Sequence, residues 1–142
     1  MPRTHSIMYL GLGIWILGTC GSCQHTGKEI AMVHRVKPDQ RDMTLIEVAG
    51  AKVQVSDPIV GPSKNLAAGF TEYLAPSRFD WTFDYDEVFF MVEGYLEVHI
   101  ADQKPLAFEV GDLGYIPKGT ESTIVVPEAA LLVHITQPAW RD

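Results

Sequence analysis

Apolar and polar positions alternate in short runs from Met43 onward, and no stretch keeps the period of a helix. Each run is rich in β-branched, aromatic or aliphatic residues, and Gly, Pro or Asp lies at most boundaries. The predicted strands are Thr44 to Val48, Lys52 to Val55, Gly69 to Leu74, Glu87 to Val92, Tyr95 to Ile100, Leu106 to Val110, Leu113 to Ile116, Ser122 to Val126 and Leu131 to Thr136. This spacing predicts an all-β sandwich or barrel rather than alternating β and α units.

Gly94 separates two of these predicted strands, and we expect a tight hairpin there. Glycine adopts the positive φ of a hairpin turn without steric cost, and the flanking strands are apolar enough to be buried. Gly111 with Asp112, and then Pro117 to Gly119, supply further turns. These positions are the predicted corners of the barrel.

Length and charge restrict the possible functions. A chain of 142 residues has room for one domain with an apolar core. A formal charge of −7, without clustered Lys and Arg, disfavours nucleic acid as a partner. Both cysteines, Cys20 and Cys23, precede the predicted strands. The barrel therefore needs neither a disulfide nor a cysteine-bound zinc ion.

Residues 1–31 differ from the predicted domain, residues 32–142, and have two interpretations. An apolar run from Ile7 to Leu17 follows Arg3 and precedes small residues, which is typical of a secretory signal and is too short for a stable membrane span. Export through residues 1–22 is then expected. Alternatively, translation starts at Met32, because the codons of Lys28 and Glu29 can form a ribosome-binding sequence upstream of it. A cytoplasmic protein is then expected.

Two spacings resemble the motifs of cupins. Glu87 and Gly94 enclose six residues, as in the second half of the first cupin motif. Gly111, Pro117 and Gly119 follow with intervals of five residues and one residue, as in the second motif. The resemblance implies an RmlC-like cupin, which is a double-stranded β-helix or jelly-roll barrel, as a single domain.

The stretch from Leu66 to Trp140 more specifically resembles the EutQ family of ethanolamine-utilisation cupins. The matching segments are Ala67-Ala68-Gly69-Phe70, Phe79-Asp80-Trp81, Tyr85-Asp86-Glu87, Val92-Glu93-Gly94, Gly111-Asp112 and Ile116-Pro117-Lys118-Gly119. The resemblance implies ethanolamine catabolism in the cytoplasm, in association with a microcompartment, and an acetate kinase activity using ATP and a divalent cation. The residues do not independently indicate phosphoryl transfer, because the chain has no Walker-type glycine loop.

The metal ligands of cupins are mostly replaced in this chain. Metal-binding cupins place two histidines on the strand before the motif glutamate and a third after the second motif. The corresponding positions here are Trp81 and Phe83, or Asp80 and Thr82 if the gap is one residue longer, and then Ser122. Because one carboxylate among aromatic rings cannot hold an iron-like ion, we expect no tightly bound transition metal or other cofactor.

Glu87 is the leading candidate for a site residue, because an unpaired acidic side chain among apolar residues is costly to bury. Residues on the same side of its strand are predicted to line a cleft with it. These are Trp81, Phe83, Tyr85, Phe89 and Met91. Each ring can equally be ordinary barrel core. His134 lies in an apolar strand and is either a site residue or a buried core histidine.

Tyr85 and Asp86 are the expected partners of Glu87 in chemistry. A pair of carboxylates can bind a small cation such as ethanolamine, aided by cation–π attraction, or can act in acid and base catalysis. Asp86 can instead be a surface residue at a strand end. An enzyme, a metal-free binding or scaffold module, and an exported cupin acting on an extracellular small molecule all remain open.

We also expect a homodimer. The strand from Glu87 to Val92 is apolar on both faces, and an open barrel of this size commonly covers such a surface with a second copy.

Overall fold

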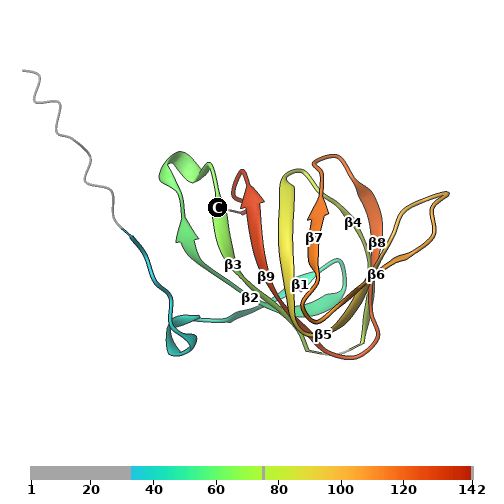
Figure 1. Ribbon diagram of the computed structural model, residues 1–142, viewed down its shortest axis with the longest axis horizontal. Coiled ribbons are helices and arrows are strands. Elements are labelled where there is room, and N and C mark those ends of the chain that lie inside the picture. The colour runs from blue at the N-terminus through green and yellow to red at the C-terminus, as the bar shows by residue number, and fades with distance from the viewer. Residues whose placement is uncertain (1–32, 75, 142) are drawn as a thin grey trace, which may run out of the picture. The chain divides into compact units, whose positions relative to one another are not determined.

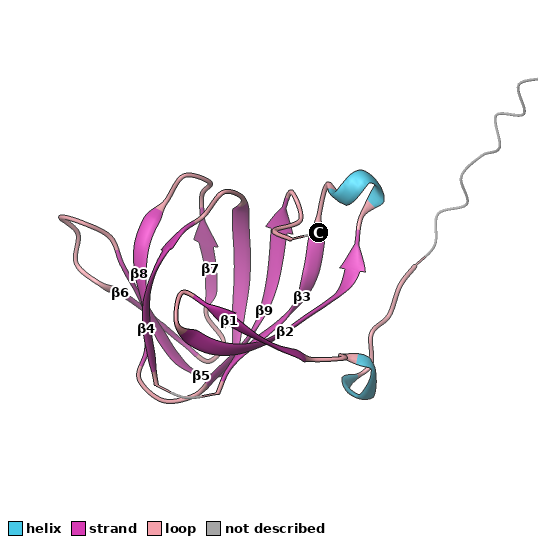
Figure 2. Cartoon of the chain, turned by 180° about the vertical axis from the view of Figure 1, so that it is seen from behind, coloured by secondary structure: helices cyan, strands magenta, loops and turns pink. Residues whose placement is uncertain are grey.

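Antiparallel strands make up most of residues 33–74 and 76–141, the residues that the computed structural model describes (Figure 1). The nine strands of this part of the chain are β1 (Thr44–Val48), β2 (Ala51–Val60), β3 (Ala67–Tyr73), β4 (Ser77–Thr82), β5 (Asp86–His99), β6 (Leu106–Glu109), β7 (Leu113–Ile116), β8 (Glu121–Val126) and β9 (Ala130–Gln137). Two short 3-10 turns, η1 (Pro38–Gln40) and η2 (Pro62–Lys64), are the helical elements (Figure 2).

All nine strands belong to one sheet that curls on itself, with the order β1-β2-β3-β9-β5-β8-β4. The first half of β5 pairs with β9 and β7, and the second half pairs with β8 and β6. The curl brings β4 close to β2 across the interior (Figure 1). The predicted all-β barrel is confirmed, and its apolar core fills the space inside the curl.

The predicted hairpin at Gly94 is wrong, because β5 runs without interruption from Asp86 to His99. The register with β9 shifts between Met91 and Glu93, and Gly94 follows with a φ of +78°. A bulge with a left-handed residue bends a strand and increases its twist. Gly94 therefore redirects β5 from one half of the sheet to the other, where the same local sequence signal suggested a reversal of the chain.

Two further strand predictions need correction. β4 (Ser77–Thr82) lies in a segment where no strand was predicted, although Phe79 faces the core there between the exposed Arg78 and Asp80. The predicted strand Lys52 to Val55 extends to Val60, because the register of β2 shifts between Ser56 and Ile59 and so accommodates Pro58. Such irregularities are where a sheet tolerates proline.

Alternation along the strands divides the side chains between the core and the surface. On β5 the buried Phe89 and Met91 alternate with Phe90, which is exposed. In the described part of the chain, no helix is long and apolar enough to cross a membrane. The predictions for a signal, an alternative start and a domain boundary fall on or next to residues 1–32, which lie outside the described residues, and stay predictions.

The fold predicts unequal effects for two glycine substitutions. A Cβ on Gly94 would lie 2.1 Å from the backbone oxygen of Ala129, whereas a Cβ on Gly111, which has a φ of +96°, meets nothing within 4 Å. Gly111→Ala should cost about 1–2 kcal/mol of unfolding free energy from backbone strain alone. Gly94→Ala should cost at least about 2 kcal/mol more, because overpacking is added. Urea unfolding at equilibrium measures both, and equal losses would contradict the role assigned to Gly94.

Candidate functional site

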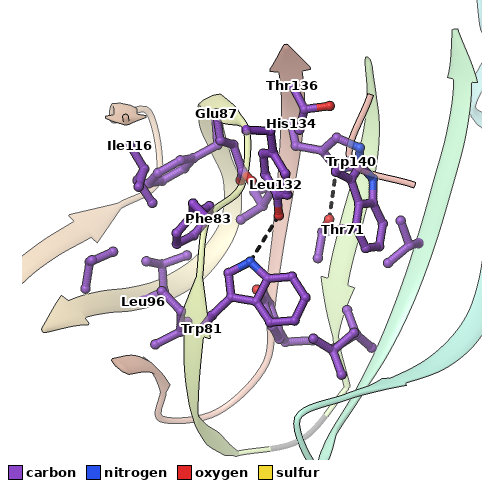
Figure 3. A pocket seen from close by; sticks show the side chains of 18 of the residues that line it. Thr71, Trp81, Phe83, Glu87, Leu96, Ile116, Leu132, His134, Thr136 and Trp140 are labelled. Carbon is purple, nitrogen blue, oxygen red and sulfur yellow. Dashed lines mark hydrogen bonds between the residues drawn. The ribbon is translucent and has the colours of Figure 1, made fainter. Parts of the chain in front are cut away.

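A partly open cavity of about 70 Å³ lies inside the curled sheet (Figure 3). Alternate side chains from β4, from β5 and from the short segment between them lie along it, as expected from the period of two in the sequence. Trp81, Phe83, Tyr85, Glu87 and Phe89 belong to this row and line the cavity. Thr71, His134, Thr136 and Trp140 are among the residues that complete the lining. We call this space the barrel cavity.

Glu87 supplies a carboxyl group to the lining of the barrel cavity. Its register partners are Ile116 on β7 and Thr136 on β9, so it lies between two neighbouring strands rather than at an edge. Loss of hydration in this apolar surrounding raises its pKa to about 8, and no other cause contributes. The group is therefore mostly protonated at neutral pH and has no cation to compensate its charge.

Thr136 faces Glu87 across the pair of strands and was not identified from the sequence. It is 1% exposed, and its hydroxyl has no hydrogen-bond partner among the described residues. A buried hydroxyl without a partner is unusual and costs free energy. The period-two row on β9 that contains His134 also contains Thr136, so the alternation could have located it.

His134 joins a chain of hydrogen bonds in the cavity wall. Its Nε2 lies 2.6 Å from Oδ1 of Asp57, and its Nδ1 lies 2.9 Å from the hydroxyl oxygen of Thr71 (Figure 3). Because an ionised carboxylate only accepts, Nε2 carries a hydrogen, and in the neutral ring the hydroxyl of Thr71 donates to Nδ1. His134 is thus both a core histidine with satisfied nitrogens and a residue of the cavity lining.

Asp57 holds the last described residues of the chain against the barrel. Its carboxylate accepts hydrogen bonds from Nε1 of Trp140 (3.1 Å) and from Nε of Arg141 (2.5 Å). Burial raises the pKa of Asp57, but the hydrogen bonds from His134 and Trp140 and the nearby charges outweigh it, so the net pKa is lower than usual. Trp140, fixed in this way, forms part of the cavity wall.

Gly69 allows β2 to bring Asp57 within reach of His134. Gly69 is the register partner of His134, and a Cβ on it would lie 1.8 Å from the backbone oxygen of Ser56. The sequence gives no local signal for Asp57, because an Asp-Pro pair is typical of a turn.

The remaining predicted site residues lie elsewhere. Asp86 accepts hydrogen bonds from the hydroxyl of Tyr115 and the backbone N–H of Lys118, both at 3.0 Å, and does not line the barrel cavity. These bonds lower its pKa, the backbone N–H first. Met91 is fully buried in the core beyond the cavity lining, and Ser122 bonds the backbone oxygen of Trp81 at 3.3 Å. Because Asp86 does not line the barrel cavity, the expected pair of carboxylates, Glu87 with Asp86, is not formed there.

Tyr85 does lie beside Glu87 in the barrel cavity. Its hydroxyl accepts a hydrogen bond from Nε1 of Trp81 at 3.1 Å. Burial, followed by the proximity of Glu87, raises its pKa. A phenol that resists ionisation remains a neutral hydrogen-bonding group at neutral pH.

The donor set of the barrel cavity does not fit the transition metal that many cupins hold. Within residues 33–74 and 76–141, no three His, Cys, Asp or Glu side chains come together in a way that could hold a metal ion. Both nitrogens of His134 already have partners, and Glu87 alone supplies too few donors.

The curled antiparallel sheet with an interior cavity defines a cupin of the RmlC-like type. An RmlC-like cupin from Shewanella frigidimarina has this fold, with a TM-score of 0.58 over 76% of this chain and 93% of the other, at 20% identity. The chain belongs to the EutQ family, because the family model described as ethanolamine utilisation protein EutQ matches residues 26–142.

Individual relatives agree with this assignment. The acetate kinase EutQ of Clostridioides difficile (strain 630) is 35% identical over 77 residues, which cover 54% of this chain and 48% of the relative. The structure of the Clostridium difficile EutQ protein has a TM-score of 0.56 at 32% identity, over 63% of this chain and 70% of the other. The chain thus spans about half the length, or less, of the curated relatives it matches.

Glu87→Gln should change the pH dependence of stability. Below pH 4.5 the folded and unfolded states both hold the proton of Glu87; between pH 4.5 and 8 the unfolded state releases it and the folded state keeps it. The unfolding free energy of the parent therefore falls by about 1.4 kcal/mol per pH unit in this window. The difference in unfolding free energy between Glu87→Gln and the parent should therefore shift by roughly 3–5 kcal/mol in favour of the variant between pH 4.5 and a pH above 8.

Urea unfolding between pH 4.5 and 9 measures this difference, with Glu93→Gln as the control because Glu93 is exposed on the same strand. Parallel pH profiles for the parent and Glu87→Gln would show that the carboxyl of Glu87 is hydrated.

Proposed function

We propose that this EutQ-family chain binds a compact small molecule of ethanolamine or acetate metabolism inside the barrel cavity, next to Glu87. The observation that carries the proposal is a buried carboxyl whose raised pKa has no compensating cation. A burial cost of this kind serves no purpose in packing and is typical of binding and catalytic sites. The surrounding rings and few polar groups match the usual composition of a small-molecule site.

The size of the barrel cavity limits its ligand. About 70 Å³ accommodates only a few non-hydrogen atoms, whereas sites for drug-sized molecules measure roughly 300–1,000 Å³. Ethanolamine and acetate meet this limit, and a nucleotide does not.

Acetate kinase activity, which the curated relatives carry in their names, is the enzymatic form of the proposal. ATP and a divalent cation would then have to bind outside the barrel cavity, with acetate inside it. A metal-free binding or scaffold module is the form without turnover. An exported cupin is the third form and depends on residues 1–22.

Ligand binding should raise the melting temperature of the full chain. A ligand at about 100 times its Kd adds about 2.7 kcal/mol to the unfolding free energy, which is a shift of several degrees. We expect ethanolamine or acetate to produce such a shift, and triethanolamine, which carries the same groups on a larger frame, to produce none. No shift with either small compound, or equal shifts with the large one, would contradict binding in the barrel cavity.

Turnover in the same samples separates the two main forms of the proposal. Formation of acetyl phosphate from acetate, ATP and Mg²⁺ would assign the enzyme. Ligand binding without any product would assign the binding module.

We also propose a homodimer formed through the apolar outer face of β5, β7 and β9. Register places Val88 between Tyr115 and Ile135, and Phe90 next to Leu113, on the side of the sheet opposite the cavity. Phe90 is 43% exposed, Leu113 71% and Tyr115 62%. A continuous apolar surface of this kind typically marks an interface.

Light scattering on a sizing column tests the dimer. The parent should elute at twice the mass of its chain at micromolar concentration. Leu113→Lys should elute as a monomer, because a charge would be buried in the interface. Leu106→Lys is the matched control, since Leu106 is an exposed leucine on β6, away from this face. A monomeric parent, or a dimer in Leu113→Lys, would overturn the assignment.

A further inference from the structure

Two polar side chains of the barrel cavity, on register partners of β5 and β9, lack hydrogen-bond partners in the described part of the chain. The carboxyl of Glu87 is desolvated without a cation, and the buried hydroxyl of Thr136, its register partner, has no hydrogen bond among the described residues. Neighbouring polar groups of the lining do have partners. Trp81 forms a hydrogen bond with Tyr85, and His134 forms hydrogen bonds with Thr71 and Asp57. The two unpartnered groups therefore mark one end of the cavity (Figure 3).

The charge distribution around this end favours a cation. The titratable groups that line the cavity with Glu87 are Tyr73 on β3, Tyr85 and His134, with the carboxylate of Asp57 behind His134. No Lys or Arg is part of the described lining. A bound anion would have no partner of opposite charge here, whereas a bound cation converts Glu87 into half of an ion pair.

The aromatic lining adds to this preference. Phe83 and Tyr85 lie edge to face, with ring centroids 5.6 Å apart, and both line the cavity with Phe89. Ring faces attract ammonium groups, most strongly where water is excluded. Aromatic rings therefore line the space in which a cation at Glu87 would lie.

We propose that the Glu87–Thr136 pair recognises a compact primary amine that carries an oxygen on the neighbouring carbon. The ammonium group donates to the carboxylate of Glu87, and the ligand's oxygen accepts a hydrogen bond from the hydroxyl of Thr136. This inference rests on the proposed function, which places a ligand in the barrel cavity, and adds its chemical class.

Binding of this class releases a proton. At pH 7 the carboxyl of Glu87 is mostly protonated, because its pKa is about 8. An ammonium group alongside favours the carboxylate, so the proton of Glu87 leaves for solvent while the ligand keeps its own. About nine-tenths of a proton per ligand should be released at pH 7. At pH 9 there should be no net release, because Glu87 is already mostly ionised and the neutral fraction of the free amine takes up a proton as it binds.

Titration calorimetry of the full chain with ethanolamine tests this directly. The apparent enthalpy, measured in two buffers of different ionisation enthalpy at pH 7 and again at pH 9, gives the number of protons released. We expect the stated values for the parent and for the control Glu93→Gln. Glu87→Gln should bind ethanolamine at least tenfold more weakly and release no proton. Binding by the parent without proton release at pH 7 would overturn the proposal.

The oxygen of the ligand is tested with Thr136→Val, which keeps the shape of the side chain and removes the hydroxyl. The variant should bind ethanolamine about three- to tenfold more weakly and bind ethylamine, which lacks the oxygen, as the parent does. Its melting temperature should equal or exceed that of the parent, because an unpartnered buried hydroxyl is removed. Equal effects on both amines, or no effect on either, would contradict the role of Thr136.

These outcomes separate the inference from the proposed function. If acetate binds in the barrel cavity and ethanolamine does not, the proposed function stands and the amine class is wrong. If no compact ligand raises the melting temperature, both are wrong.

Discussion

The desolvation of one carboxyl group is the constraint around which this barrel is organised. Glu87 lies on the strand shared by both halves of the sheet, with Ile116 and Thr136 as its cross-strand neighbours, so it lies away from the sheet edges. Burial moves its pKa from 4.5 to about 8, which corresponds to several kcal/mol that folding must offset at alkaline pH. A glutamine or an aliphatic residue would fill the same space without this cost. Packing therefore does not account for an acid at this position, which supports the ligand site proposed at Glu87.

The course of β5 explains why a single residue acquires this position. A hairpin at Gly94 would reverse the chain at that point. The register shift after Met91 and the positive φ of Gly94 instead carry the strand across the fold. Its first half is then enclosed between β7 and β9, while its second half joins β6 and β8. Gly94 thus lies where β5 passes from one pair of neighbouring strands to the other.

Local patterning predicts those parts of the site that one strand determines by itself. The alternation from Trp81 to Phe89 places a row of rings beside Glu87, because side-chain direction in a strand follows a period of two and the short segment between β4 and β5 keeps the same alternation. The bend at Gly94 cannot be told from a turn locally, since both need a glycine with positive φ. Asp57 and His134 are 77 residues apart, and their contact depends on the irregularity in β2 and the close approach at Gly69. Such long-range pairing leaves no periodic signal in the sequence.

The two carboxyl groups that face the interior have opposite surroundings and opposite pKa shifts. Asp57 is enclosed by His134, Trp140 and Arg141, its pKa is lowered, and its role is to hold the last described residues against the barrel. Glu87 lies in the same core with its pKa raised, beside a hydroxyl that is also unpartnered. Because the fold can evidently surround an acid with donors, the lack of donors at Glu87 is not a limitation of the barrel. This contrast between two acids in one core is the structural basis for the ligand proposed at Glu87.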